Sequence, residues 1–226
     1  MTGGGLWGTL LPLIVASAVV PVQITLTVLL LRASVGAAAA WVGGMTATRL
    51  AQGVLFGLVF AGAGAESESG DGAGLVEAGL LLVIAVLLLT TAVRTLLGGS
   101  DEDAPPPKWM KLTASATPGR AFLLGAGFVA VAAKLWVFTL GAIGAIEGAA
   151  LGRWSSVAVF LLFVILAESV VIALVAYAAL APGPSQVLLG RVSAWLERHS
   201  RAIVIVLGLV FGTWFLLKAL SGLGAI

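Results

Sequence analysis

Long apolar runs separated by short polar breaks dominate the hydrophobic pattern of this chain. A helix needs about 20 apolar residues to cross the hydrocarbon core of a bilayer, and several runs reach that length. The predicted membrane-spanning helices cover residues 6–31, 36–62, 74–97, 121–144, 154–180 and 202–220. The pattern therefore predicts an all-α integral membrane protein with six transmembrane helices.

The longest polar segment, residues 99–120, divides the chain into two halves, residues 1–98 and 121–226. It contains an acidic run, three consecutive prolines and several basic residues, and the prolines favour an extended linker. Each half contains three predicted spans, so the two halves must enter the membrane from opposite sides. This arrangement is typical of transporters built from inverted repeats, and we predict two inverted three-helix repeats.

A shorter helix is predicted at residues 185–200, before the last span. Four of its apolar residues recur at spacings of three and four and so share one face: Leu188, Val192, Trp195 and Leu196. The basic residues lie mostly on other faces. We expect an interfacial amphipathic helix that contacts the membrane surface through Arg191, Trp195 and Arg198. The alternative is that these arginines serve only to orient the chain.

The distribution of basic residues predicts the orientation. The loops after the first, third and fifth spans carry Arg32, Arg94, Lys108, Lys111, Arg120, Arg191, Arg198 and Arg201. The opposite side carries Arg153 and, near the end of the last span, Lys218. Because basic residues accumulate on the cytoplasmic side, we place the linker and the amphipathic helix in the cytoplasm. We expect a multi-pass protein of the bacterial plasma membrane with both termini outside.

The composition excludes a soluble globular enzyme. Apolar residues make up 60% of the chain and charged residues only 10%, against about 25% charged residues in an ordinary soluble domain. The net charge of +2 is too small to indicate a nucleic-acid partner. The chain has no cysteine and one histidine, which excludes thiolate and multi-histidine metal sites. It has no phosphate-binding loop, HExxH or GxSxG motif, so we expect neither enzyme activity nor a cofactor.

Three ionisable residues lie deep inside predicted spans: Arg49, Lys134 and Glu168. Each lies 13 or 14 residues from the start of its span, or about 20 Å along a helix. Each such residue costs about 2.5–3.5 kcal/mol to insert, so it needs a partner or a water-filled cavity. The equal depths predict one shared site at the midplane.

Glu168 can neutralise only one of the two cations at this site. The remaining cation could bind an anionic headgroup, or Lys134 and Glu168 could exchange a proton during transport. The structural alternative is a static ion pair that holds helices together. Three further residues are predicted at the site: Pro21, Gln23 and Trp136. Pro21 would break the first span and expose backbone groups to a substrate, or it would only kink the helix.

Three segments resemble those of a known family. They are LLPLIVASAVVPVQITLTVLLL at residues 10–31, PKWMKLTASATPGRAFLLGAGF at 107–128, and FGTWFLLKALSGL at 211–223. The second is the most specific, with its Pro-x-Trp-Met stretch followed by Thr-Pro-Gly. The chain resembles the GAP family of the LysE exporter superfamily, also called the sulfolipid-addressing or peptidoglycolipid-addressing proteins.

The chain departs from this family pattern at two motifs. Relatives carry Asn-Pro-Lys in the fourth span, where this chain has Ala132, Ala133 and Lys134. Only Lys134 therefore matches this family motif. Relatives carry Ser-Pro-x-Pro in the first span, where this chain keeps Pro21 and has Gln23 in place of the second proline. The resemblance implies that Lys134 and Pro21 are functional positions.

The resemblance also implies a function in moving envelope lipids to the cell surface. We predict a membrane transporter that assists export or flipping of a lipid or glycolipid, with its anionic headgroup bound at the midplane. The alternatives are a proton-coupled exporter of an amino acid or ion, and a non-transporting subunit of an envelope-lipid export complex. The expected partners are membrane lipids, the lipid or glycolipid substrate and the envelope-lipid export machinery.

Two GxxxG motifs, Gly53/Gly57 and Gly208/Gly212, let helices approach closely. They fit packing inside the bundle better than dimerisation. The superfamily resemblance nevertheless keeps a homodimer among the expected assemblies.

Overall fold

The computed structural model describes residues 4–66, 71–98 and 117–224, and every regular element in these ranges is an α-helix. The helices are α1 (Gly4–Ala18), α2 (Pro21–Ala33), α3 (Val35–Glu66), α4 (Asp71–Leu96), α5 (Pro118–Val131), α6 (Ala133–Gly148), α7 (Arg153–Ala167), α8 (Ser169–Leu180) and α9 (Pro182–Gly222). The all-helical fold class is confirmed. Residues 99–116 of the predicted linker lie outside the described residues.

Three of the predicted spans are each divided into two helices. The bends are 45° between α1 and α2, 69° between α5 and α6, and 61° between α7 and α8. The first break directly precedes Pro21, the first residue of α2, as the missing N–H of proline predicts. The second break lies at Ala132 and the third at Glu168. Neither position is a proline or glycine, and neither break was predicted.

By length and hydropathy, one helix in the described ranges could cross a membrane, the stretch Arg201–Gly222 of α9. The number rises to four if each bent pair forms one span. Helix α3 is long enough, but Arg49, Gln52 and several threonines and glycines lower its hydropathy. The positions of the helices agree with the predicted spans, while the count of six stays a prediction.

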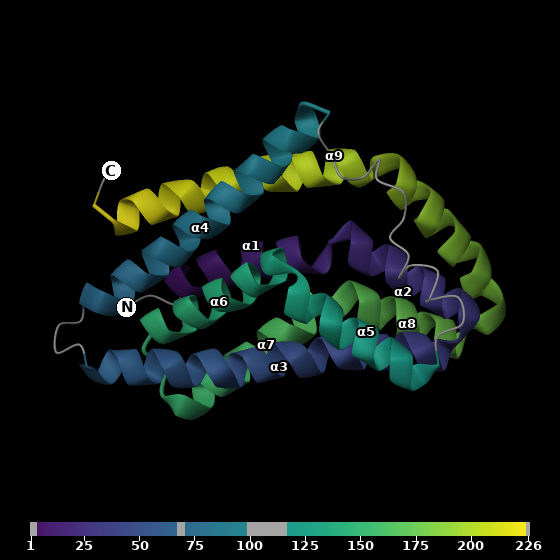
Figure 1. Cartoon of the computed structure of the whole chain (residues 1–226), viewed down its shortest axis with the longest axis horizontal. Coiled ribbons are helices and arrows are strands. Elements are labelled where there is room, and N and C mark those ends of the chain that lie inside the picture. Colours follow the sequence, from purple (N-terminus) through teal and green to yellow (C-terminus); the bar gives the residue numbers. More distant parts are fainter. Residues whose placement is uncertain (1–3, 67–70, 99–116, 225–226) are drawn as a thin grey trace.

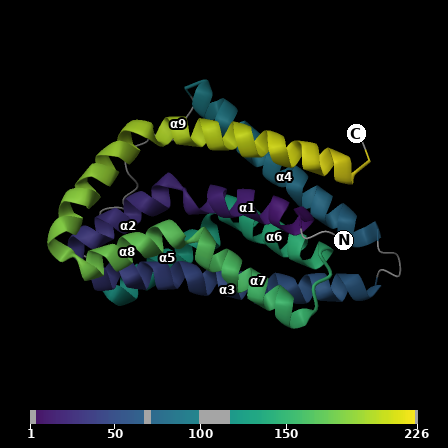
Figure 2. The same cartoon turned by 180° about the vertical axis from the view of Figure 1, so that it is seen from behind.

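The helices form an elongated bundle (Figures 1 and 2). The three bent pairs and α3 run along its long axis, and α4 packs against the second half of α9. Both termini lie at one end of the bundle, together with the connection from α6 to α7. The turns from α2 to α3 and from α8 to α9 lie at the other end. Many outward side chains are apolar, among them Val131, Leu123 and Leu58.

Glycines allow the closest helix contacts. A Cβ atom on Gly125 of α5 would overlap the carbonyl oxygen of Trp41 on α3, and one on Gly44 of α3 would overlap that of Phe122 on α5. Small residues permit such backbone approach.

The GxxxG glycines pack mostly inside the protein. Gly208 and Gly212 of α9 pack against Ala92 and Leu89 of α4, and Gly53 packs against Phe160 of α7. The predicted packing inside the bundle is confirmed for these three glycines, whereas nothing lies within 4 Å of a Cβ atom on Gly57.

The predicted amphipathic helix at residues 185–200 is not a separate helix, because α9 continues from it into the apolar stretch without a break. Trp195 and Val192 lie three residues apart on this helix, as predicted, but only Val192 is packed against the protein. Leu189 is buried and Val192 packs against the core, but Trp195 is 52% exposed. Positions 192 and 195 lie about 60° apart around a helix, so Val192 is at the edge of the face that Leu189 buries and Trp195 projects beyond it.

The close contact between α3 and α5 predicts unequal effects for two glycines of α5. Gly125→Ala should destabilise the protein by about 1–3 kcal/mol, because the added methyl group overpacks a backbone contact. Gly127→Ala is the matched control, since a Cβ atom there meets nothing within 4 Å. Thermal unfolding of the purified variants in detergent measures the difference. Equal stability of the two variants would contradict the described packing.

Candidate functional site

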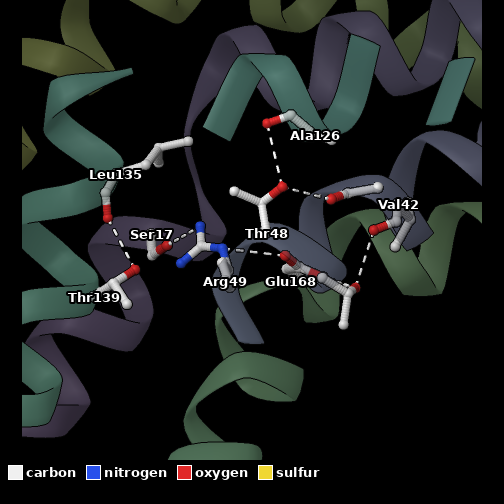
Figure 3. A network of polar contacts seen from close by, with 10 residues as sticks. Ser17, Val42, Thr48, Arg49, Ala126, Leu135, Thr139 and Glu168 are labelled. Atoms are coloured by element: carbon white, nitrogen blue, oxygen red, sulfur yellow. Dashed lines mark hydrogen bonds and ion pairs between the residues drawn. The ribbon is translucent and has the colours of Figure 1, made fainter. Parts of the chain in front are cut away.

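Arg49 lies at the centre of the buried polar site. It is on α3, and its side chain is 0% exposed. Its Nη2 atom donates a 2.9 Å hydrogen bond to the hydroxyl of Ser17, near the end of α1. Figure 3 shows Ser17 and Thr139 on one side of the guanidinium group and Glu168 on the other. The site therefore joins α3 to the first and third helix breaks.

Glu168 is the charge partner of Arg49. Its Oε1 atom lies 3.1 Å from Arg49 Nε, and its side chain is 1% exposed. Its Oε2 atom accepts a 2.5 Å hydrogen bond from the hydroxyl of Thr46, one turn before Arg49 on α3. The residue itself forms the break between α7 and α8. The carboxylate thus holds the bend of the fifth predicted span against α3.

A second polar contact ties α3 to α5. The hydroxyl of Thr48 lies 3.1 Å from the carbonyl oxygen of Gly44 and 3.3 Å from that of Ala126 (Figure 3). It is next to Arg49 in the sequence but on another side of the helix. Helix α3 therefore contacts the second half of the chain through polar side chains on two sides.

Several buried polar side-chain atoms, one of them on Arg49, have no hydrogen-bond partner among the described residues. They are Arg49 Nη1, Gln23 Nε2, and both Nε2 and Oε1 of Gln52. Gln52 is 4% exposed and Gln23 is 1% exposed. Buried polar groups are almost always paired because leaving one unpaired costs about 1–3 kcal/mol. These atoms are free to bind a polar ligand or water.

The position of Gln52 follows from its neighbours on α3. Thr48, one turn before it, contacts Ala126 of α5, and Phe56, one turn after it, makes an edge contact with Trp136 of α6 at 5.5 Å. Residues four apart share a helix face. Gln52 therefore lies on the face of α3 that is turned toward the break between α5 and α6.

The structure places the other predicted residues near helix breaks. Pro21 begins α2, and Gln23 lies two residues later. Trp136 lies in the first turn of α6, and its indole N–H donates a 2.9 Å hydrogen bond to the carbonyl oxygen of Ala130 on α5. Lys134 is the second residue of α6, but its side chain lies outside the described residues. The predicted Lys134 contribution to the site stays a prediction.

The equal depths of Arg49 and Glu168 predicted that they would lie at one level, whereas Ser17, Thr46 and Gln52 were not predicted at the site. Thr46, Arg49 and Gln52 follow one another at spacings of three, a polar stripe in an otherwise apolar helix. That spacing could have identified two of the missed residues. Ser17 shows no comparable signal, because serine is common in membrane helices and can bond its own backbone.

The site around Arg49 and Glu168 is closed to the protein surface. Both charged groups are shielded from the surface, so an external ligand reaches Arg49 only if helices move. Removal of one partner of a buried pair leaves an uncompensated charge and costs about 3–5 kcal/mol. A ligand with its own negative charge could replace Glu168 at the guanidinium group and avoid this cost.

The fold and site define a helical membrane protein with an internal ion pair at the junction of broken helices. Residues 10–221 match the family model described as Sap, sulfolipid-1-addressing protein. The chain therefore belongs to the sulfolipid-1-addressing protein family. No curated protein and no solved structure matches the chain.

The buried pair predicts strong coupling between Arg49 and Glu168. Arg49→Gln and Glu168→Gln should each lower the free energy of unfolding by about 3–5 kcal/mol, because each leaves one charge unpaired. The double variant should lose less than the sum of the two. Unfolding in mixed detergent micelles measures these values.

Ser17→Ala is the control for this cycle, because it removes a hydrogen bond and keeps both charges. It should cost about 1 kcal/mol. Additive effects of the two charge substitutions would show that the ion pair contributes little.

Proposed function

We propose that this protein is a membrane transporter that assists the export or flipping of envelope lipids. The anionic headgroup of the lipid binds near the midplane at Arg49, while the acyl chains remain in the bilayer. The protein acts without a cofactor and is not an enzyme. The substrate class is a lipid or glycolipid of the cell envelope.

Family membership supports the lipid part of this proposal. The family is described by the addressing of a sulfolipid, and its model covers residues 10–221. A sulfolipid headgroup carries negative charge, which a cation inside the membrane would compensate. The apolar helices of the described ranges fit a protein in contact with lipid.

The observation that carries the proposal is the unpartnered Nη1 atom of a fully buried Arg49. Arginine stays charged and presents a planar set of donors that suits sulfate, phosphate and carboxylate groups. In the closed state Glu168 neutralises this charge through Nε. An incoming headgroup would accept hydrogen bonds from the free donor and displace the carboxylate.

The breaks in the helices supply a way to open the site. Glu168 is itself at a break, Ser17 is close to another, and Gln52 faces the third. Backbone that leaves the helical pattern inside a membrane is tolerated where it lines a cavity or is buried in protein. Rotation about these bends would separate Glu168 from Arg49. Lys134, at the start of α6, adds a second cation for the headgroup.

The topology we propose has six spans arranged as two inverted repeats. The position of both termini at one end of the bundle agrees with an even number of crossings (Figure 1). We propose that this end faces outward from a bacterial plasma membrane. The homodimer and the association with export machinery remain proposals that follow from the family.

The enclosed position of Arg49 also suits a second candidate, a proton-coupled exporter of an amino acid or ion. Such a protein would need a closed aqueous cavity, and Glu168 would carry the proton. The lipid proposal instead requires a lateral opening between helices. The two candidates therefore predict different losses when the protein is removed. The lipid transporter predicts loss of an envelope lipid from the cell surface, and the solute exporter predicts loss of an excreted amino acid or ion.

We expect deletion of the gene in the source organism to remove one envelope-lipid class from surface extracts while that lipid accumulates inside. The intact protein should restore it, and Arg49→Gln combined with Lys134→Gln should reduce restoration at least tenfold, because two cations for the headgroup are lost. Mass spectrometry of surface and whole-cell lipids gives the ratio, with membrane protein levels matched by immunoblot.

Arg153→Gln is the matched control, because Arg153 is exposed at the start of α7, and it should restore surface lipid fully. An unchanged surface lipid profile after deletion, with a change in an excreted amino acid or ion, would replace the lipid proposal with the solute exporter. If the purified protein flips no lipid in vesicles although cells require it, the accessory-subunit alternative gains support.

A further inference from the structure

The first part of α9 crosses one end of the bundle before the helix turns along α4 (Figures 1 and 2). We name residues 183–199 the crossing segment. It follows Pro182 and is continuous with the apolar stretch Arg201–Gly222. The end of α2, which carries Arg32, and the start of α5, which carries Arg120, lie at the same end of the bundle (Figure 1).

The inner face of the crossing segment is occupied by the protein itself. Ser185 and Leu189 are each 1% exposed, and Val192 packs against the core. Helix α9 contacts α2 and α8. An interfacial helix ordinarily turns its apolar face into the lipid, and here Leu189 and Val192 are turned toward the protein instead.

The outer face combines basic and apolar side chains. Five exposed residues form what we call the outer stripe: Val187, Leu188, Arg191, Trp195 and Arg198. The last three follow at spacings of four and three, so they project from one side of the helix. Val187 is 60% exposed and Trp195 is 52% exposed. The indole of Trp195 is stacked on the His199 ring, with ring centroids 5.0 Å apart.

Arg201 holds the junction of the crossing segment and the apolar stretch. Its Nε and Nη2 atoms donate hydrogen bonds of 3.2 and 3.3 Å to the carbonyl oxygens of Thr95 and Leu96, the last residues of α4. A cation at this position stabilises a helix C-terminus. Arg198 and Arg191 precede this junction by about 5 and 15 Å along the helix. The outer stripe is therefore held at a set distance from the apolar stretch.

We propose that the outer stripe binds the anionic phospholipid surface of the membrane leaflet at this end of the bundle. The inference rests on the membrane placement in the proposed function, but it does not depend on transport. Arginines attract anionic headgroups, and tryptophan prefers the level of the headgroups. Because the other apolar face is docked on α2 and α8, binding occurs at the headgroup level and depends on lipid charge.

A lipid surface fits the stripe better than a protein partner does. The stripe is narrow, alternates charge with apolar groups and continues directly into a helix that could cross the membrane. Its two arginines should each raise binding to an anionic surface about fivefold, or about 25-fold together. A partner protein would not require this dependence on the charge of the lipids.

The chain has no cysteine, so Val187→Cys in the full-length protein provides a single site for an environment-sensitive fluorophore. We expect its emission to shift to the blue, and quenching by headgroup spin-labelled lipid to increase at least twofold, when phosphatidylcholine vesicles contain 30% phosphatidylglycerol. Arg191→Gln with Arg198→Gln in this background should return both signals to the pure phosphatidylcholine values. Arg153→Gln is the matched control and should change neither signal.

Equal signals in the two vesicle types, or no effect of the double arginine substitution, would overturn the proposal. A stripe that binds a partner protein would give this negative result, because no partner is present. Val206→Cys, at a 56% exposed position in the apolar stretch, reports insertion through quenching by acyl-chain spin labels. If the fluorophore at Val206→Cys is quenched and the one at Val187→Cys is not, only the outer-stripe proposal fails. If neither is quenched, the membrane placement fails as well.

Discussion

The need to compensate a buried arginine governs the arrangement of this protein. Arg49 is fully buried, and its charge is balanced by Glu168 at 3.1 Å. A guanidinium group cannot readily lose its proton, so the chain must bring an anion to it. The carboxylate comes from the point where α7 ends and α8 begins. One electrostatic requirement therefore joins α3 to the bent fifth span, and the hydroxyls of Ser17 and Thr46 complete the contact.

The same requirement links stability to function. Among the described residues, Arg49 Nη1 has no hydrogen-bond partner, and neither has the side chain of Gln52 one turn later on α3. These groups carry a cost in the closed state that a bound polar ligand would relieve. The bends that close around the pair are also the places where the backbone can rotate. In the function proposed above, the charge would recognise the headgroup and the bends would give access to it.

Much of this could be predicted from the sequence. The run lengths gave the helix positions, and the equal depths of Arg49 and Glu168 indicated their meeting. Pro21 predicted the first break because proline lacks an N–H. The breaks at Ala132 and Glu168 have no proline or glycine to signal them, and Glu168 is tied to Arg49 and Thr46 of the distant helix α3. The exposure of Trp195 could not be predicted for a related reason. Periodicity identifies an apolar stripe, but the packing of α9 on α2 and α8 decides which residues are covered. The hydrogen bond of Ser17 depends on the fold in the same way.

The glycine contacts have a consequence for how the two halves of the chain could move. Helix α3 of the first half is locked against α5 of the second, and α9 of the second half is locked against α4 of the first. Backbones that touch directly cannot slide without collision. If these contacts persist during motion, each rigid unit contains one helix from each half of the chain. A conformational change that keeps these contacts would move α3 together with α5, and α4 together with α9. The moving units would then not be the two halves of the chain that the linker separates.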